Sequence, residues 1–132
     1  MVQIAGKYQL VETQNFDKFL VSSGVSEEKA KKINEAKPII DVSFDGNRIK
    51  IETNLHKLTT ELVLDQESEE KLFSGQSIKS VAKLVDNVIT VKSVGLDGNS
   101  VGKRTMTFSD SGMETVYTTK DNIVAKRIYK RV

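Results

Sequence analysis

After Pro38 the chain is a succession of short runs with strand character, separated by tight-turn sequences. The turn sequences are Asp45-Gly46-Asn47, Asp86-Asn87, Asp97-Gly98-Asn99, Ser111-Gly112 and Asp121-Asn122, whose residues tolerate positive φ. The runs that we expect to be strands are Gly6–Thr13, Ile39–Phe44, Ile49–Asn54, Lys57–Leu64, Ile78–Val85, Val88–Val94, Ser100–Phe108, Met113–Thr119 and Asn122–Val132. With a short strand at Lys71–Phe73 they make nine or ten antiparallel strands in a meander. This pattern favours an up-and-down barrel or a sandwich.

Two short helices are expected between the first strand and Pro38. The first covers Phe16–Ser23, with Asn15 as its N-cap and Gly24 at its end. The second covers Glu27–Ala36 and is capped by Ser26. Its apolar stripe is thin, so we expect it to pack weakly and to be a mobile element. The stripe consists of Ala30, Ile33 and Ala36.

Composition narrows the function classes. A chain of 132 residues is expected to form a single domain over 1–132. Twenty Lys and Arg against eighteen Asp and Glu are too balanced for a general nucleic-acid binder. The chain has no Cys, so disulfides and Cys-ligated zinc are excluded. We expect a soluble cytoplasmic protein, because neither a secretory signal nor a membrane-spanning apolar run is visible. We also expect it to be a monomer.

Residue patterns for catalysis or for a cofactor are missing. His56 is the one histidine and has no partners at a recognisable metal or triad spacing. The sequence Ser109–Gly112 is a turn rather than a nucleophile elbow, and Asp97-Gly98-Asn99 lacks the other ligands of a calcium loop. Glu67, Glu69 and Glu70 are expected in a solvated acidic loop. We therefore predict no enzyme activity, no cofactor and no metal site.

The last strand carries a cation on the face expected to be buried. Ile123, Ala125, Arg127 and Tyr129 share that face, because strand side chains alternate. The other face carries lysines at 126 and 130 and should be exposed to solvent. A buried guanidinium is costly unless an anion meets it. The anion comes from an acid of the protein or from a ligand; the alternative is an exposed arginine at a sheet end.

Several strands offer small or hydroxylic side chains to one face. Ile78–Val85 presents Ser80 and Ala82 beside Ile78 and Leu84, and Val88–Val94 presents Ser93. The chain has no Trp and only five Phe with which to fill a wide barrel. A partly hydrated cavity is the expectation for such a closed sheet.

Five sequence runs resemble the intracellular lipid-binding proteins, which include fatty-acid-binding and cellular retinoid-binding proteins. The runs are Gly6-Lys7-Tyr8-Gln9-Leu10, Asn15–Leu20, Lys37-Pro38, Ile78-Lys79-Ser80 and Lys126–Lys130. The resemblance extends over the whole chain. It implies a mainly β fold of the calycin type: a ten-stranded antiparallel up-and-down β-barrel, or β-clam, with a helix-turn-helix lid and one internal lipophilic ligand.

In many members of this family two arginines and a tyrosine hold the ligand carboxylate. The resemblance assigns Arg127 and Tyr129 as the last two of these residues. The position of the first arginine aligns with Met106, and Arg104 lies two residues upstream on the same strand face. Either Arg104 takes the role through a small register shift, or the site holds a single arginine.

These observations together predict a carrier for a long-chain fatty acid or a related lipophilic carboxylate. Retinoid or bile-acid binding is one alternative, and a membrane-interacting structural protein with incidental lipid is another. Lys29, Lys31 and Lys32 are candidates for transient contact with anionic membrane. The residues expected to line the cavity or its portal are Phe16, Ile33, Ile40, Ile51, Leu55, Phe73, Met106 and Val116.

Overall fold

The structure is a computed structural model that describes residues 4–22, 25–53, 59–71, 77–95, 100–119 and 122–132. These residues contain ten strands and two helices. The elements are β1 (Gly6–Gln14), α1 (Phe16–Ser22), α2 (Glu27–Glu35), β2 (Ile39–Asp45), β3 (Arg48–Thr53), β4 (Thr59–Val63), β5 (Glu67–Lys71), β6 (Ser77–Val85), β7 (Val88–Gly95), β8 (Ser100–Phe108), β9 (Gly112–Thr119) and β10 (Val124–Arg131).

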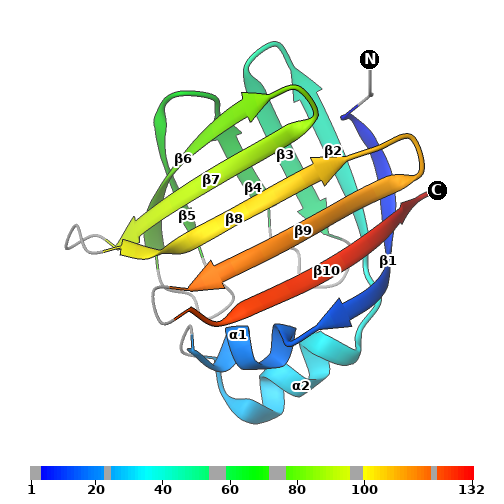
Figure 1. Ribbon diagram of the computed structural model, residues 1–132, viewed down its shortest axis with the longest axis vertical. Helices are drawn as coiled ribbons and strands as arrows, with labels where there is room; N and C mark the ends of the chain where they lie inside the picture. The colour runs from blue at the N-terminus through cyan, green and yellow to red at the C-terminus, as the bar shows by residue number, and fades with distance from the viewer. Residues whose placement is uncertain (1–3, 23–24, 54–58, 72–76, 96–99, 120–121) are drawn as a thin grey trace.

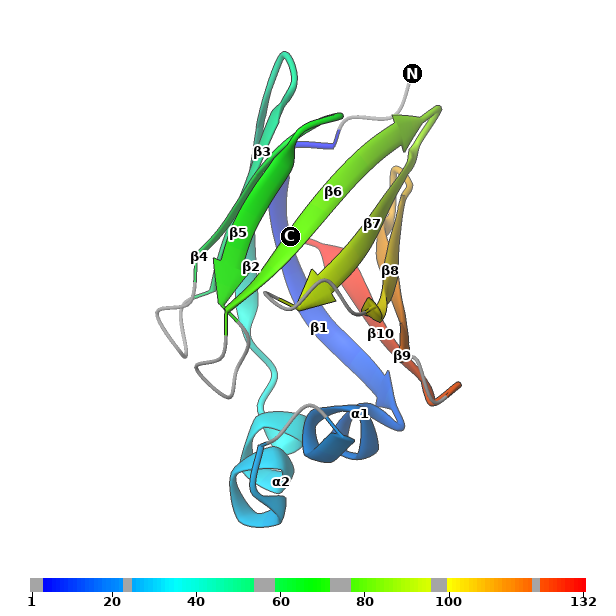
Figure 2. The same cartoon turned by 90° about the vertical axis from the view of Figure 1, so that its left-hand side faces the viewer.

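All ten strands belong to one sheet, in the order β4-β3-β2-β1-β10-β9-β8-β7-β6-β5 (Figure 1). Every named strand pair in it is antiparallel, and β1 pairs with β10 as well as with β2. The two edge strands, β4 and β5, lie side by side, so the sheet curves into a nearly closed barrel (Figure 2). The predicted up-and-down barrel is therefore confirmed, and the sandwich is excluded.

The two helices lie together beneath one end of the barrel, where α1 contacts β10 (Figures 1 and 2). Ser26 caps α2 as predicted, because its Oγ accepts a hydrogen bond from the Lys29 backbone N–H at 3.3 Å. The prediction for Asn15 is wrong. Its φ is +56°, and its side-chain amide donates to the Val124 carbonyl at 3.3 Å, which ties the start of α1 to β10. Gly24 lies outside the described residues.

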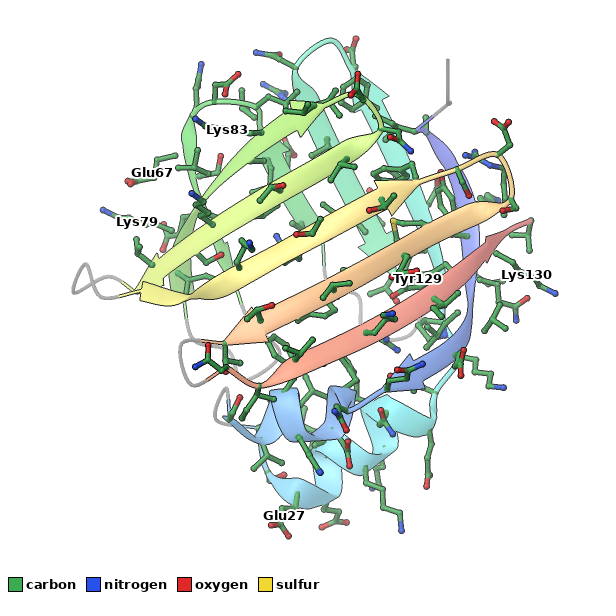
Figure 3. The ribbon with its side chains drawn as sticks, in the orientation of Figure 1. Glu27, Glu67, Lys79, Lys83, Tyr129 and Lys130 are labelled. Atoms are coloured by element: carbon green, nitrogen blue, oxygen red, sulfur yellow. The ribbon has the colours of Figure 1, made fainter. Side chains whose placement is uncertain are left out.

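The acidic segment forms a strand rather than the expected loop. Glu67 and Glu69 alternate with Ser68 along β5, and these three residues pair with Val81, Lys79 and Ser80 of β6. The two glutamates therefore lie on the outer face, where Glu67 approaches Lys79 at 3.6 Å (Figure 3). Alternation was hidden in the sequence because neither face of β5 is apolar. Of the short strand expected at Lys71–Phe73, Lys71 is the last residue of β5, and residues 72 and 73 lie outside the described residues.

The buried apolar side chains form two clusters. The larger, inside the barrel, consists of Ile4, Tyr8, Leu10, Ile40, Val42, Ile49, Leu62, Ala82, Ile89, Val91, Met106, Phe108, Met113 and Tyr129. The smaller joins the helices to the sheet and consists of Phe16, Leu20, Val25, Ala30, Ile33 and Ala125. We call the second set the helix cluster. Neither helix in the described part of the chain has the length and apolarity needed to cross a membrane.

Candidate functional site

The candidate site begins on β10, whose side chains alternate strictly between the two faces of the wall. Ala125, Arg127 and Tyr129 are buried, whereas Val124 and Lys130 are exposed. Figure 3 shows Tyr129 within the outline of the barrel and Lys130 projecting away from it. The inward direction predicted for Arg127 from strand alternation is what the structure gives.

Arg127 is a deeply buried cation whose guanidinium is only partly satisfied. The residue is 4% exposed, and its Cζ lies 4.1 Å from the centre of the Phe16 ring and 5.9 Å from that of Tyr129. Its Nε and Nη2 atoms are buried and have no hydrogen-bond partner. No acid forms an ion pair with Arg127 among the residues that the structure describes. The aromatic rings offset part of the cost of burying the charge, but they do not satisfy the N–H groups.

A second arginine of the same strand, Arg131, differs from Arg127 in having hydrogen-bond acceptors for its guanidinium. Arg131 lies over the Tyr8 ring at 4.8 Å, near the barrel end away from the helices. Its Nη1 donates to the Ala5 carbonyl and its Nη2 to the Ser109 carbonyl, both at 3.1 Å. Arg131 therefore has backbone acceptors, and its hydrogen bond to Ala5 connects the two ends of the chain. The buried Nε and Nη2 of Arg127, by contrast, have no such acceptor.

The Tyr129 phenol is next to this cation and remains protonated. Burial raises the pKa of Tyr129 above its usual value, and the neighbouring Tyr117 phenol adds to the rise. Arg127 opposes the shift in this pKa but does not cancel it. A protonated phenol beside a guanidinium is an O–H donor, so the two groups together are suited to an oxyanion.

Arg104 lies on the inner face of β8. It pairs with Tyr117 of β9, while Met106 pairs with Thr115, which in turn pairs with Arg127. Arg104 is half-buried and its Nε is buried. From Arg127, Arg104 is reached by crossing to the second neighbouring strand and moving two residues along it, which corresponds to roughly 12 Å between the Cα atoms. Both side chains are long enough to approach one ligand group from opposite sides, or to hold water between them.

The helix cluster covers this part of the wall. Phe16 is fully buried, and its ring is 5.6 Å from that of Phe19 and 5.3 Å from that of Tyr117. The Phe19 and Tyr117 rings are 4.7 Å apart. Phe16 therefore contacts the cation on one side and the aromatic side chains of α1 and β9 on the other. Sequence reasoning missed Tyr117 as a neighbour of the site; it shares a strand face with Thr115 and Met113.

The residues expected to line the cavity are divided between the barrel interior and the helix cluster. Phe16 and Ile33 are buried in the helix cluster, and Ile40 and Met106 are buried within the barrel. Ile51 packs against the barrel interior. Whether these five side chains contact a ligand stays a prediction. Leu55 and Phe73 lie outside the described residues.

The assignment of Val116 to the cavity is wrong. Val116 pairs with Lys126 of β10 and with Thr105 of β8, so it lies on the outer face with the Lys126 side chain. Met113, Thr115 and Tyr117 occupy the inner face of β9 instead. Within the described part of the chain, no group of three or more His, Cys, Asp or Glu side chains is placed to hold a metal ion.

Comparison with known proteins places this arrangement in a family. Residues 5–131 match the model described as the lipocalin / cytosolic fatty-acid binding protein family. A fatty acid-binding protein of Tyrophagus putrescentiae is 31% identical, over 99% of both chains. Sodium/calcium exchanger regulatory protein 1 of Doryteuthis pealeii is 29% identical, over 98% of this chain and 96% of its own. The crystal structure of a fatty acid-binding protein from Drosophila melanogaster brain is 26% identical, covers 94% of this chain and 95% of its own, and superposes with a TM-score of 0.82.

Proposed function

The chain belongs to the lipocalin / cytosolic fatty-acid binding protein family, and on that premise we propose that it binds a long-chain fatty acid inside its barrel and carries it through the cytoplasm. The observation that carries this proposal is Arg127, a buried cation whose Nε and Nη2 lack hydrogen-bond partners. An anionic head group with an apolar tail is the ligand class that satisfies such a cation within an apolar wall. Related lipophilic carboxylates belong to the same class.

The two parts of the ligand contribute differently. Each buried methylene of the tail contributes about 0.8 kcal/mol, so the tail supplies most of the affinity. The carboxylate accepts charge-assisted hydrogen bonds from Arg127 and a hydrogen bond from the Tyr129 phenol, which fixes its orientation. Arg104 takes the place of the arginine expected at Met106, either directly or through a bridging water. The inner-face register of Arg104 supports this role.

Displacement of a fluorescent fatty-acid probe tests the proposal. Oleate should displace the probe with a stoichiometry of one per chain. Oleyl alcohol, which has the same tail but no charge, should bind at least 10-fold more weakly, as expected when a charged hydrogen bond of about 1.5–3 kcal/mol is lost. A protein that binds neither ligand stoichiometrically would not be a carrier. Equal affinities for the acid and the alcohol would show that Arg127 is not the anchor.

We further propose that the basic face of α2 brings the barrel to anionic membranes. Lys29, Lys31 and Lys32 are exposed, whereas Ala30 and Ile33 of the same helix are buried in the helix cluster. Lys32 approaches Glu28 at 3.7 Å, but both side chains are largely exposed, and such pairs are weak and easily exchanged. The lysines can therefore face lipid head groups while the apolar side of the helix stays packed.

Transfer of a fluorescent fatty acid to vesicles measures this contact. The rate should rise with the content of anionic lipid and fall as salt screens the lysines. Changing Lys29, Lys31 and Lys32 to Glu should remove both dependences and leave the equilibrium affinity nearly unchanged. The matched control reverses three exposed lysines elsewhere on the barrel, Lys83, Lys92 and Lys130, and should retain both dependences. A rate that ignores vesicle charge and concentration would mean release by aqueous diffusion.

A further inference from the structure

Thr115 of β9 lies at the centre of the three residues assigned to the ligand carboxylate. It pairs directly with Arg127 of β10 on one side and with Met106 of β8 on the other. Tyr129 is two residues along β10 from Arg127, and Arg104 is two residues along β8 from Met106. Cβ atoms of directly opposed residues are about 4.5–5.5 Å apart, and those of diagonal neighbours about 7–8 Å. Thr115 is therefore a direct or diagonal neighbour of all three carboxylate residues.

The Thr115 side chain belongs to the interior of the barrel. It is 2% exposed, and it shares the inner face of β9 with Met113, which is also buried. Its direct partners, Arg127 and Met106, are buried as well. A hydroxyl in such a place costs free energy unless a hydrogen bond satisfies it. Valine has nearly the same shape without this cost, so packing alone does not account for a threonine at this position.

A second threonine next to Arg127 has its hydroxyl hydrogen already committed. Thr13 of β1 pairs with Arg127 from the side opposite to Thr115. The Thr13 Oγ1 donates to the Asn34 Oδ1 of α2 at 3.3 Å. A threonine hydroxyl has a single hydrogen to donate, so Thr13 keeps acceptor sites only. None of the side-chain hydrogen bonds between described residues involves Thr115, whose hydroxyl hydrogen is therefore available.

A carboxylate at Arg127 has room for one more donor. Its two oxygens offer roughly four acceptor sites. The unpartnered Nε and Nη2 of Arg127 and the Tyr129 phenol supply three hydrogens for these sites. Met106 adds none, because its side chain has no donor. Thr115 is on the strand next to Arg127, whereas Arg104 is one strand further away, so the threonine is the nearer source of the fourth hydrogen bond.

We propose that Thr115 is a ligand-binding residue whose hydroxyl donates a hydrogen bond to the fatty-acid carboxylate, in the place that Met106 leaves without a donor. The inference rests on the proposed function, because it takes the carboxylate to lie at Arg127. A neutral donor stabilises the ionised acid and lowers the pKa of its carboxyl group. Unlike a further arginine, it does so without adding a buried charge to the empty barrel.

The test compares two substitutions at this position. Thr115→Val removes the hydroxyl and keeps the shape, and it should weaken oleate binding about 10-fold, as expected for one hydrogen bond to a charged group. Oleyl alcohol should lose less than about threefold, because its hydrogen bond to the hydroxyl is between neutral groups. Thr115→Ser keeps the hydroxyl and should retain the preference for the acid. Thr13→Val is the matched control on the other side of Arg127, and any loss in it should be equal for acid and alcohol.

Carbon-13 NMR of oleate labelled at the carboxyl carbon gives a second readout, which a change in packing alone would not move. Titration of the bound ligand should show a higher carboxyl pKa in Thr115→Val than in the natural protein, because a donor to the ionised form is lost. Thr115→Ser and Thr13→Val should leave this pKa unchanged. Without ligand, Thr115→Val should be at least as stable toward denaturant as the natural protein, since it removes a buried hydroxyl that has no partner to lose.

The outcomes separate this inference from the proposed function. Unchanged oleate affinity in Thr115→Val overturns the role of the hydroxyl and leaves the carrier function standing. Equal losses for acid and alcohol, with the pKa of the bound carboxyl unmoved, also overturn it, because Thr115 would then serve the packing of the wall. Failure of the natural protein to bind oleate overturns the proposed function and this inference together.

Discussion

Replacing Arg127 with glutamine is expected to weaken oleate binding by about 10- to 150-fold, the equivalent of a charged hydrogen bond worth roughly 1.5–3 kcal/mol. Oleyl alcohol should lose less than threefold, because its affinity comes from the tail alone. Titration calorimetry or probe displacement measures both ligands on both proteins. The comparison between acid and alcohol isolates the charge from any general disturbance of the barrel.

Two further variants make this experiment decisive. Arg48→Gln applies the same substitution to an exposed arginine of β3 that pairs with Glu61, and it should leave oleate binding unchanged. Arg104→Gln should weaken oleate binding. If both arginines hold one carboxylate, the loss of binding free energy in the Arg104→Gln/Arg127→Gln double variant should be smaller than the sum of the losses in the two single variants. Equal losses for acid and alcohol in Arg127→Gln would refute the anchor. A strictly additive double variant would place Arg104 outside the carboxylate site.

The Arg127→Gln substitution should stabilise the ligand-free protein. Arg127 is buried with two unpartnered N–H groups, and removing an uncompensated buried charge should raise the free energy of unfolding by about 1–3 kcal/mol. Denaturant unfolding of the two proteins without ligand measures this difference. Saturating oleate should stabilise the natural protein more than the Arg127→Gln variant, because the stabilisation grows with the logarithm of the affinity; the order of stability should reverse when the loss in binding free energy exceeds this gain. Arg127 thus lowers the stability of the empty barrel and raises the affinity for the acid.

The sequence predicted which side chains of the last strand point into the barrel, because the two faces of this strand differ strongly in charge. Lysines at 126 and 130 mark the outer face of β10, and the structure accordingly places Arg127 and Tyr129 inside. β9 gave no such signal, since each of its faces mixes hydroxyls with an apolar or aromatic side chain. Only the pairing of Val116 with Lys126 separates the two faces, and cross-strand register is not visible in a single sequence.

Contacts between distant segments were equally hidden. Phe16 was expected near the cavity, but its position over the Arg127 guanidinium depends on how α1 docks against β10. Asn15 has the composition of an N-cap, yet in the fold its amide meets the Val124 carbonyl and its backbone is left-handed. In both cases the tertiary contact between the helix start and β10 decided the local structure, and local sequence preferences do not encode that contact.

Truncating Phe16 to alanine is expected to lower the free energy of unfolding by about 3–5 kcal/mol, the range for deleting a large buried aromatic side chain. Phe16 is fully buried and contacts both the helix cluster and Arg127, so the neighbouring elements cannot easily close the cavity. Phe19→Ala is the matched control, because Phe19 belongs to the same helix but is only partly buried, and its loss should be smaller. Denaturant unfolding gives both values. A loss in Phe16→Ala no larger than in Phe19→Ala would mean that the helices are held by other contacts.

A double-mutant cycle then separates the packing of Phe16 from its contact with the cation. Phe16→Leu keeps an apolar side chain but removes the ring, and Arg127→Met keeps a long side chain but removes the charge. The coupling free energy between the two changes should be about 0.5–2 kcal/mol, the range for a cation over an aromatic face that is largely removed from water. The short distance of 4.1 Å between the Arg127 Cζ and the ring centre favours the upper part of that range. A coupling below about 0.3 kcal/mol would lie within the additivity of independent sites and would refute the interaction. A clear coupling would mean that Phe16 stabilises the charged form of Arg127 in the empty barrel, and so keeps the anion site formed before the ligand arrives.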